Sequence, residues 1–372
     1  MQRVAIVGAS LAGLRCAQAL RSKGFDGTIS LYGDEPDLPY DRPPLSKQVL
    51  SGEWAPDKIA LADDSTYEKL DLELHLGTRV ERIDDVGAFD HLVVATGARP
   101  RTIDGPGAVV RTLADALALR DRLAHAQRVA VVGAGFIGAE VAAVARAAGK
   151  HVTLLEALPQ PLSRGLGEEV GAALGRLHAA KGVELRTGVG VASIDERGVH
   201  LADGEVVDAD VVVVGIGVTP NVEWLEGSGA ELDNGVLCDE SLRVVGLDDV
   251  WAAGDVARWP HARYGEIRIE HWTNAVEQGQ HVAACITGEV TPFAAVPFVW
   301  SDQYEHRIQI VGRPSPTDEV RVVHGSLDAP PWAVEHLGPG GELHGVTGVD
   351  AVKVVMPYRR SLAPLMRGEG VK

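Results

Sequence analysis

The sequence predicts an α/β fold with two doubly wound, Rossmann-like three-layer domains and a small C-terminal α+β domain. Two glycine-rich turns of the dinucleotide-binding type begin at Gly8 and Gly133, and the tetrapeptide AAGD follows at residues 252–255. Each turn comes after a β-branched run and opens an alanine-rich helical pattern. Because the motif requires a strand, a tight turn and a helix in this order, the two copies predict two dinucleotide-binding domains.

The composition is that of a globular protein with an acidic surface. A chain of 372 residues with 45% hydrophobic and 23% charged residues predicts two or three domains. The formal net charge of -17 opposes nonspecific binding to nucleic acid or to an anionic membrane, so we expect neither as a partner. No apolar stretch reaches the ~18 residues that a membrane-spanning helix needs.

The cysteines and histidines indicate neither a disulfide framework nor a metal site. Cys16, Cys238 and Cys285 are far apart and form no CxxC pair, which fits a reducing cytoplasm. The thirteen histidines show no metal-ligand spacing, and we expect no metal.

In each glycine turn the first glycine permits the backbone angles and the second lets the chain approach a pyrophosphate closely. The helix that follows offers free N–H groups and a positive dipole. The motif positions are Gly8, Ser10 and Gly13 in the first copy and Gly133, Gly135 and Gly138 in the second. Ser10 replaces a glycine, which predicts a less close approach in the first site.

The two units look like a duplication, because the second turn begins 125 residues after the first, at Gly133 against Gly8. The two copies differ in the length of the segment that precedes their matching buried strands. From Thr78 to Asp90 the first copy spans 12 positions, whereas from Thr187 to Asp210 the second copy spans 23. The additional residues alternate around Asp203-Gly204 and predict a β-hairpin that the first copy lacks.

The second domain is expected to be inserted into the first, because AAGD resembles the flavin-binding end of such domains. Short β-like runs with Pro and Trp then predict the third domain. The expected boundaries are 1–110 with 236–290 for the first domain, 111–235 for the second and 291–372 for the C-terminal domain.

An acidic residue after the second strand of each unit is placed to bind a ribose. In the first unit Asp34 or Glu35 can do so, with a solvated acidic turn as the alternative. In the second unit Glu156 ends the run HVTLLE, where a carboxylate binds both ribose hydroxyls of NAD and repels a 2′-phosphate. Arg164, the nearest cation downstream, could soften this preference.

Four segments carry a family resemblance: LPYDRPPLSK (38–47), the second turn running into Glu140, TNAVEQG, and VPFVWSDQYEHRIQIVG (296–312). The DRPPLSK and WSDQ parts are far more specific than either glycine motif. Together the four segments resemble the ferredoxin reductases of oxygenase systems, within the glutathione-reductase-like FAD superfamily. The resemblance covers nearly the whole chain and weakens after about Asp350. It implies FAD in the first domain and NADH in the second.

The resemblance also implies the site residues. Lys47 and Glu140 would form a catalytic pair beside the hydride-accepting nitrogen of the flavin, whereas a first-turn helix acid is the alternative for Glu140. Arg42 would contact the FAD pyrophosphate or neighbouring polar groups, with an exposed loop position as the alternative. Asp255 would contact the ribityl chain and Trp272 the isoalloxazine, with an interior structural tryptophan as the alternative for Trp272. The other expected cofactor contacts are Val80, Ala95, Thr96, Gly97, Arg111 and Gly254 for FAD, and Ile137 and Gly217 for NAD.

The implied activity is NADH-dependent reduction of a 2Fe-2S ferredoxin that serves an oxygenase. A cysteine relay is disfavoured, because the loop that would carry the cysteine reads RPPLSK. The alternatives are a reductase of rubredoxin or of a small molecule, and an NADH-gated binding protein resembling apoptosis-inducing factor. Local cations must overcome the net charge to dock an acidic ferredoxin, and the candidates are Arg307, Arg313, Arg359 and Arg360.

Overall fold

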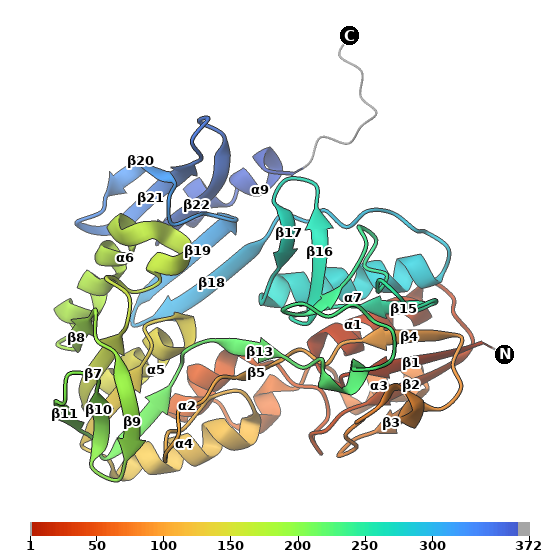
Figure 1. Ribbon diagram of the computed structural model, residues 1–372, viewed down its shortest axis with the longest axis horizontal. Coiled ribbons are helices and arrows are strands. Elements are labelled where there is room, and N and C mark those ends of the chain that lie inside the picture. Colours follow the sequence, from red (N-terminus) through yellow and green to blue (C-terminus); the bar gives the residue numbers. More distant parts are fainter. Residues whose placement is uncertain (1, 364–372) are drawn as a thin grey trace.

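The first glycine turn lies at the carboxyl end of a five-stranded parallel sheet (Figure 1). The computed structural model describes residues 2–363. In spatial order the strands of this sheet are β15 (Val250–Ala252), β4 (His91–Val94), β1 (Arg3–Val7), β2 (Thr28–Tyr32) and β3 (Leu72–His75). Since β1 is central and covered on both faces, its apolar residues are fully buried.

Two helices, α1 (Leu11–Ser22) and α7 (Trp272–Ile286), lie against each other and against this sheet. Their close approach requires Gly279, where a Cβ would lie 2.4 Å from the carbonyl oxygen of Ala12. Residues far apart in sequence therefore share one core. The short segments between β2 and β3 are 3₁₀ helices at Pro43–Ser46 and Pro56–Ile59, with α2 (Gln48–Ser51) and α3 (Asp64–Leu70).

The second glycine turn lies at the end of a four-stranded parallel sheet built in the same way. Its strands in spatial order are β12 (Val211–Val214), β6 (Arg128–Val132), β7 (His151–Glu156) and β8 (Glu184–Thr187). The helices are α4 (Leu113–His125), α5 (Phe136–Ala147) and α6 (Ser163–Ala180). β6 begins 125 residues after β1, at Arg128 against Arg3, so these strands have the offset from which the sequence predicts a duplication.

The predicted hairpin is present only in the second copy among the described residues. It is formed by β10 (Gly198–Leu201) and β11 (Val206–Asp208), and β9 (Val191–Asp195) adds a third antiparallel strand. The first copy instead has a short 3₁₀ helix at Ile83–Val86.

Two crossing segments connect the domains. β5 (Ala98–Pro100) pairs antiparallel with β13 (Val218–Pro220), and the chain then enters a 3₁₀ helix at Glu223–Leu225. Trp224 and Leu225 already belong to the first core. We therefore propose that the chain returns to the first domain near Asn221, ahead of the expected boundary at residue 236. The small sheet that follows contains β14 (Val236–Leu237), β16 (Ala257–His261) and β17 (Gly265–Arg268).

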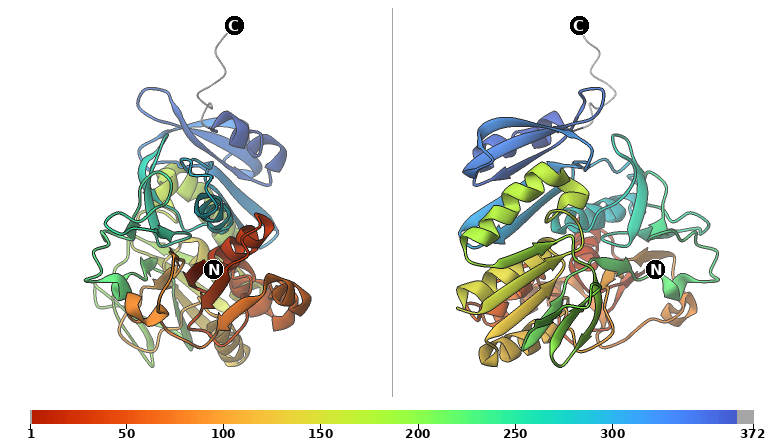
Figure 2. Two further views of the ribbon diagram at one scale, coloured as in Figure 1. Left: turned by 90° about the vertical axis from the view of Figure 1, so that its right-hand side faces the viewer. Right: turned by 60° about the vertical axis from the view of Figure 1, so that its left-hand side comes forward.

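The C-terminal domain is an antiparallel sheet that packs on α6 (Figure 2). In spatial order its strands are β18 (Phe298–Gln303), β19 (His306–Gly312), β22 (Leu343–Val349), β21 (Ala329–Leu337) and β20 (Glu319–Ser326). The short helices α8 (Val352–Val355) and α9 (Tyr358–Ser361) follow. The predicted fold class is confirmed, although residues 364–372 of the expected third domain lie outside the described part. No helix in the described part is both long and apolar enough to cross a bilayer.

Besides the contact with α6, strand β18 reaches the cores of the other two domains. It contacts α5 of the second domain and α7 of the first. One strand thus meets both dinucleotide-binding domains.

Because α1 and α7 are in close contact, any side chain at position 279 is expected to destabilise the folded protein. Gly279→Ala should lower the free energy of unfolding by about 1–3 kcal/mol, because the added Cβ collides with backbone. Gly165→Ala is the matched control, since Gly165 is an exposed helical residue with no atom within 4 Å of its Cβ position. Denaturant unfolding would measure both, and an equal effect of the two changes would contradict this account of the packing.

Candidate functional site

A large cavity lies where the two dinucleotide-binding domains meet β18. Its walls come from the turn after β1, the Arg42–Lys47 segment, the start of α5 and the start of α7. The residues expected from the sequence that line it are Gly8, Ser10, Asp34, Glu35, Arg42, Lys47, Ala95, Thr96, Gly97, Arg111, Gly135, Ile137, Glu140, Gly217, Gly254, Asp255 and Trp272. Both glycine turns therefore open into one space.

Five of the expected residues do not line the cavity: Gly13, Val80, Gly133, Gly138 and Glu156. Gly13 and Gly138 instead allow each helix to pack on its own turn. A Cβ on Gly13 would lie 2.1 Å from the carbonyl oxygen of Gly8, and one on Gly138 would lie 2.0 Å from that of Gly133. Val80 is buried in the first core.

The N-terminus of α1 is open to an anion. Ser10 occupies the N-cap position without making a capping hydrogen bond, and the first turn of α1 has no acidic residue. The hydroxyl of Ser10 accepts instead from Nε of Arg42, at 3.3 Å. The first-turn N–H groups and the helix dipole thus combine with the guanidinium groups of Arg42 and Arg111, which fits a dinucleotide pyrophosphate.

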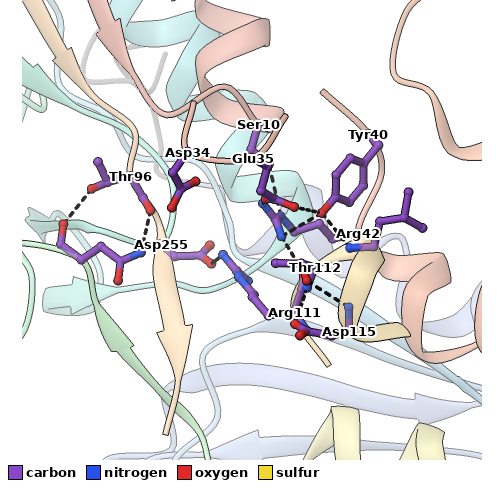
Figure 3. Close-up of polar contacts among 12 residues, drawn as sticks. Ser10, Asp34, Glu35, Tyr40, Arg42, Thr96, Arg111, Thr112, Asp115 and Asp255 are labelled. Carbon is purple, nitrogen blue, oxygen red and sulfur yellow. Dashed lines mark hydrogen bonds and ion pairs between the residues drawn. The ribbon is translucent and has the colours of Figure 1, made fainter. Parts of the chain in front are cut away.

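Glu35 holds Arg42 in place (Figure 3). The Arg42 Nη2 to Glu35 Oε1 distance is 2.6 Å, and the two side chains are 24% and 23% exposed. The hydroxyl of Tyr40 donates to the other oxygen of Glu35, while Arg42 donates to the carbonyl oxygen of Arg111 at 2.5 Å. The carboxylate of Glu35 is therefore committed to protein partners.

Asp34, unlike Glu35, is not held by a close ion pair. Its side chain is 64% exposed, and the nearest cationic atom, Nη1 of Arg79, is 4.0 Å away. An exposed carboxylate at the cavity edge remains available to a ribose hydroxyl.

Asp255 of the first domain pairs with Arg111, at the expected start of the second domain (Figure 3). They pair at 3.3 Å, and burial lowers the pKa of Arg111 although Asp255 offsets part of this effect. Nearby, Thr96 and Asn221 exchange two hydrogen bonds, at 2.8 Å and 2.9 Å, which tie together the segments after β4 and β13.

Lys47 and Glu140 form a buried ion pair, with side chains that are 12% and 4% exposed. The Nζ to Oε2 distance is 2.8 Å. Glu140 also accepts from the hydroxyl of Ser46 at 2.5 Å and from that of Ser301 at 2.7 Å. The carboxylate is thereby satisfied without water, and Lys47 keeps further N–H donors for a ligand in the cavity.

Trp272 is fixed by a hydrogen bond and by a second tryptophan. Its Nε1 donates to Asp41 at 2.6 Å, and its ring meets Trp300 edge to face at a centroid distance of 5.9 Å. The neighbouring His271 lines the cavity, and Nδ1 of this residue has no partner among residues 2–363. Burial lowers the pKa of His271 to about 4, so the imidazole is neutral near pH 7.

The N-terminus of α5 faces the same cavity. It has Gly135 at the N-cap, no capping side chain and no acidic residue in the first turn. Ile137 is 43% exposed there, which provides an apolar surface for a planar ring. Glu156 lies behind the turn, where it accepts from the N–H groups of Ala134 and Leu158 at 2.8 Å and 2.9 Å.

Several site residues were not predicted from the sequence: Asp41, Ser46, His271, Trp300 and Ser301. All lie within or beside the motifs that carry the family resemblance, and this proximity was the available signal. Spacing could not pair Ser301 with Glu140, because they are 161 positions apart.

The four arginines expected to dock ferredoxin differ in whether they form ion pairs within the protein. Arg307 is paired with Asp302 at 2.7 Å, and Arg359 with Glu277 at 2.9 Å. Arg313 and Arg360 are exposed and form no ion pair within the described chain. Of the four, these two carry uncompensated charge.

Two family models match the chain. The pyridine nucleotide-disulphide oxidoreductase model covers residues 2–279, and the reductase C-terminal model covers residues 298–367.

Similar proteins of known name are reductases. Rhodocoxin reductase of Rhodococcus erythropolis is 38% identical over 98% of this chain and 90% of its own length. The ferredoxin–NAD(+) reductase component of the anthranilate 1,2-dioxygenase system of Burkholderia cepacia is 38% identical over 96% and 93%. The crystal structure of the covalent putidaredoxin reductase-putidaredoxin complex matches with a TM-score of 0.90 and 34% identity, over 97% of this chain and 93% of that one.

The buried pair predicts a stability effect that needs no ligand. Lys47→Met should lower the free energy of unfolding by about 3 kcal/mol or more, because Glu140 would remain buried without its cation. The double change Lys47→Met with Glu140→Gln should cost less than the sum of the single changes.

The control for this experiment is the exposed pair Arg3–Glu73, with side chains that are 44% and 49% exposed. Arg3→Met should change the unfolding free energy by no more than about 0.5 kcal/mol. Additive effects at Lys47 and Glu140 would show that the two charges do not depend on each other.

Proposed function

The chain belongs to the pyridine nucleotide-disulphide oxidoreductase family, and from this premise we propose that it is an FAD-dependent NADH:ferredoxin reductase of an oxygenase system. The observation that carries the proposal is that Ser10 and Gly135, from the two glycine turns, open into one cavity with Lys47 and Glu140 between them. This arrangement fits two dinucleotides that meet at their reactive rings. The similar ferredoxin–NAD(+) reductase component of the anthranilate 1,2-dioxygenase system supports the same activity.

Bound FAD supplies the ability to accept a hydride from NADH and to release electrons singly. The protein holds and orients it. The α1 N-terminus, Arg42 and Arg111 would bind the pyrophosphate, and Asp34 would bind the adenosine ribose, because Glu35 is already committed to Arg42. Asp255 would bind the ribityl chain.

Lys47 and Trp272 would act near the reacting ring. The ammonium of Lys47 would stabilise negative charge on the ring without reorganisation, because Glu140 holds the ammonium in position. Trp272, fixed by Asp41 and Trp300, excludes water from one side of the cavity.

The cavity does not support a cysteine relay. None of the three cysteines, all within the described residues, lines it. Burial raises the pKa of Cys16 to about 12, which suppresses the reactive thiolate. The disulphide chemistry in the family name is therefore not part of our proposal, and three reduced buried thiols support a cytoplasmic location.

Experiment must distinguish this proposal from two alternatives. One is a reductase of rubredoxin or of a small molecule, and the other is an NADH-gated binding protein. The similarity to a ferredoxin–NAD(+) reductase component favours ferredoxin over both. A binding protein would be reduced quickly by NADH and reoxidised slowly by any acceptor.

The test of the proposed function begins with the released cofactor. We expect one noncovalent FAD per chain, identified by mass spectrometry, and NADH-driven reduction of a 2Fe-2S ferredoxin faster than that of free dyes. Arg313→Glu should raise the KM for ferredoxin severalfold at low salt, because it reverses an unpaired charge, and should leave flavin reduction by NADH unchanged.

Arg82→Glu is the control for the change in net charge, since Arg82 is 77% exposed and lies between β3 and β4 of the first domain. Absence of FAD after reconstitution would overturn the whole proposal. FAD binding with ferredoxin reduced no faster than free dyes would leave the small-molecule alternative.

Glu156 predicts a preference for NADH over NADPH. A 2′-phosphate near this carboxylate would bring like charges together, and each ~1.4 kcal/mol corresponds to tenfold selectivity. Glu156→Ala should narrow the ratio of kcat/KM values for NADH and NADPH roughly tenfold. Glu205→Ala, on the hairpin of the same domain, should leave this ratio unchanged, and equal use of both nucleotides by the unmodified protein would contradict the assignment.

A further inference from the structure

A chain of hydrogen bonds runs from the Lys47–Glu140 pair into the protein interior. Oε1 of Glu140 accepts from Ser301 at 2.7 Å, and the Ser301 hydroxyl lies 3.2 Å from Nε2 of Gln303. Oε1 of Gln303 lies 3.1 Å from Nε2 of His178, whose Nδ1 lies 2.9 Å from the hydroxyl of Tyr304. The chain is continuous over four links beyond the ion pair.

The direction of every hydrogen bond in this series is fixed, because the ionised carboxylate of Glu140 can only accept. Ser301 must donate its hydroxyl proton to Glu140, so it accepts from the amide nitrogen of Gln303. The amide oxygen of Gln303 then requires a proton on Nε2 of His178. His178 therefore accepts at Nδ1, and Tyr304 donates to it.

Burial leaves few alternatives to this arrangement. Ser301 is 0% exposed, Gln303 and His178 are each 1% exposed, and Glu140 is 3% exposed. Burial lowers the pKa of His178 to about 4, so the ring is neutral near pH 7, as the two hydrogen bonds require. A break at any link would leave a polar atom without a partner.

The chain also joins all three domains. Glu140 and His178 lie on α5 and α6 of the second domain, Ser301 and Gln303 on β18 of the third, and Lys47 in the first. His178, Gln303 and Ser301 do not line the cavity, so they have no direct contact with a ligand there.

We propose that Ser301, Gln303 and His178 are positioning residues that fix the Glu140 carboxylate and so determine how much of the Lys47 charge acts on the bound flavin. The inference rests on the proposed function. While Ser301 donates to Glu140, part of the carboxylate charge is balanced by a donor other than Lys47. Without that donor, Glu140 balances more of the ammonium charge, and reduced flavin is less stabilised.

The test is the midpoint potential of the bound FAD, measured against a reference dye in the holoenzyme. Ser301→Ala should lower the equilibrium constant for flavin reduction about tenfold, which is about 30 mV for a two-electron couple. Tyr304→Phe, at the far end, should shift the potential in the same direction by a smaller amount. Ser301→Thr keeps the hydroxyl and should restore the original value.

Tyr264→Phe is the matched control, because Tyr264 is also a partly buried tyrosine. Its hydroxyl is not part of the hydrogen-bond chain and donates to the carbonyl oxygen of His344 at 3.3 Å. It should leave the potential unchanged. An unchanged potential in Ser301→Ala or, if that variant does not fold, in Tyr304→Phe would overturn the proposal. So would an equal shift in Tyr264→Phe.

A second measurement separates this inference from the proposed function. The tautomer of His178 is visible in nitrogen NMR of the protein without cofactor, and we expect the proton on Nε2. A proton on Nδ1 would overturn the hydrogen-bond chain whether or not the protein reduces ferredoxin. If the protein does not bind FAD but His178 carries its proton on Nε2, the proposed function and the link to flavin would be overturned. The hydrogen-bond chain from Glu140 to Tyr304 would still stand.

Discussion

The buried contact between Lys47 and Glu140 is the constraint on which the rest of the site depends. Neither charge is stable in the interior alone, so the first domain must supply the cation, the second the carboxylate, and the third the hydroxyl of Ser301. The three domains are thereby held in one relative placement. The cavity lies at their junction, and residues of both glycine turns line it together with Lys47 and Glu140.

The duplicated design provides two helix N-termini with the same chemistry and different surroundings. The first is accompanied by Arg42 and Arg111, which add positive charge for a tightly held dinucleotide. The second is accompanied by the exposed Ile137 and by Glu156, with no comparable pair of arginines lining the cavity within the described chain. This asymmetry fits a resident cofactor on one side and an exchanging substrate on the other.

Sequence reasoning located most of the cavity because its residues belong to local motifs. The glycine turns, AAGD and the segment up to Lys47 each specify a local backbone form, so the positions of Gly8, Gly135, Asp255 and Lys47 could be anticipated. It could not choose between Asp34 and Glu35, which are adjacent in sequence. Our proposal of Asp34 rests on Arg42, whose side chain pairs with Glu35 in the folded loop.

The sequence by itself determined the fold class, the duplication at an offset of 125 residues and the kind of cofactor chemistry, because these depend on periodicity and on short motifs. Only the tertiary structure decided which side chains satisfy Glu140. Ser301 lies 161 positions from Glu140, and Gln303 lies 125 positions from His178, so no local pattern relates the partners in either hydrogen bond. The physical reason is that a buried charge must be matched by whichever donors the packed domains bring within hydrogen-bond distance, and packing is not encoded at fixed spacing.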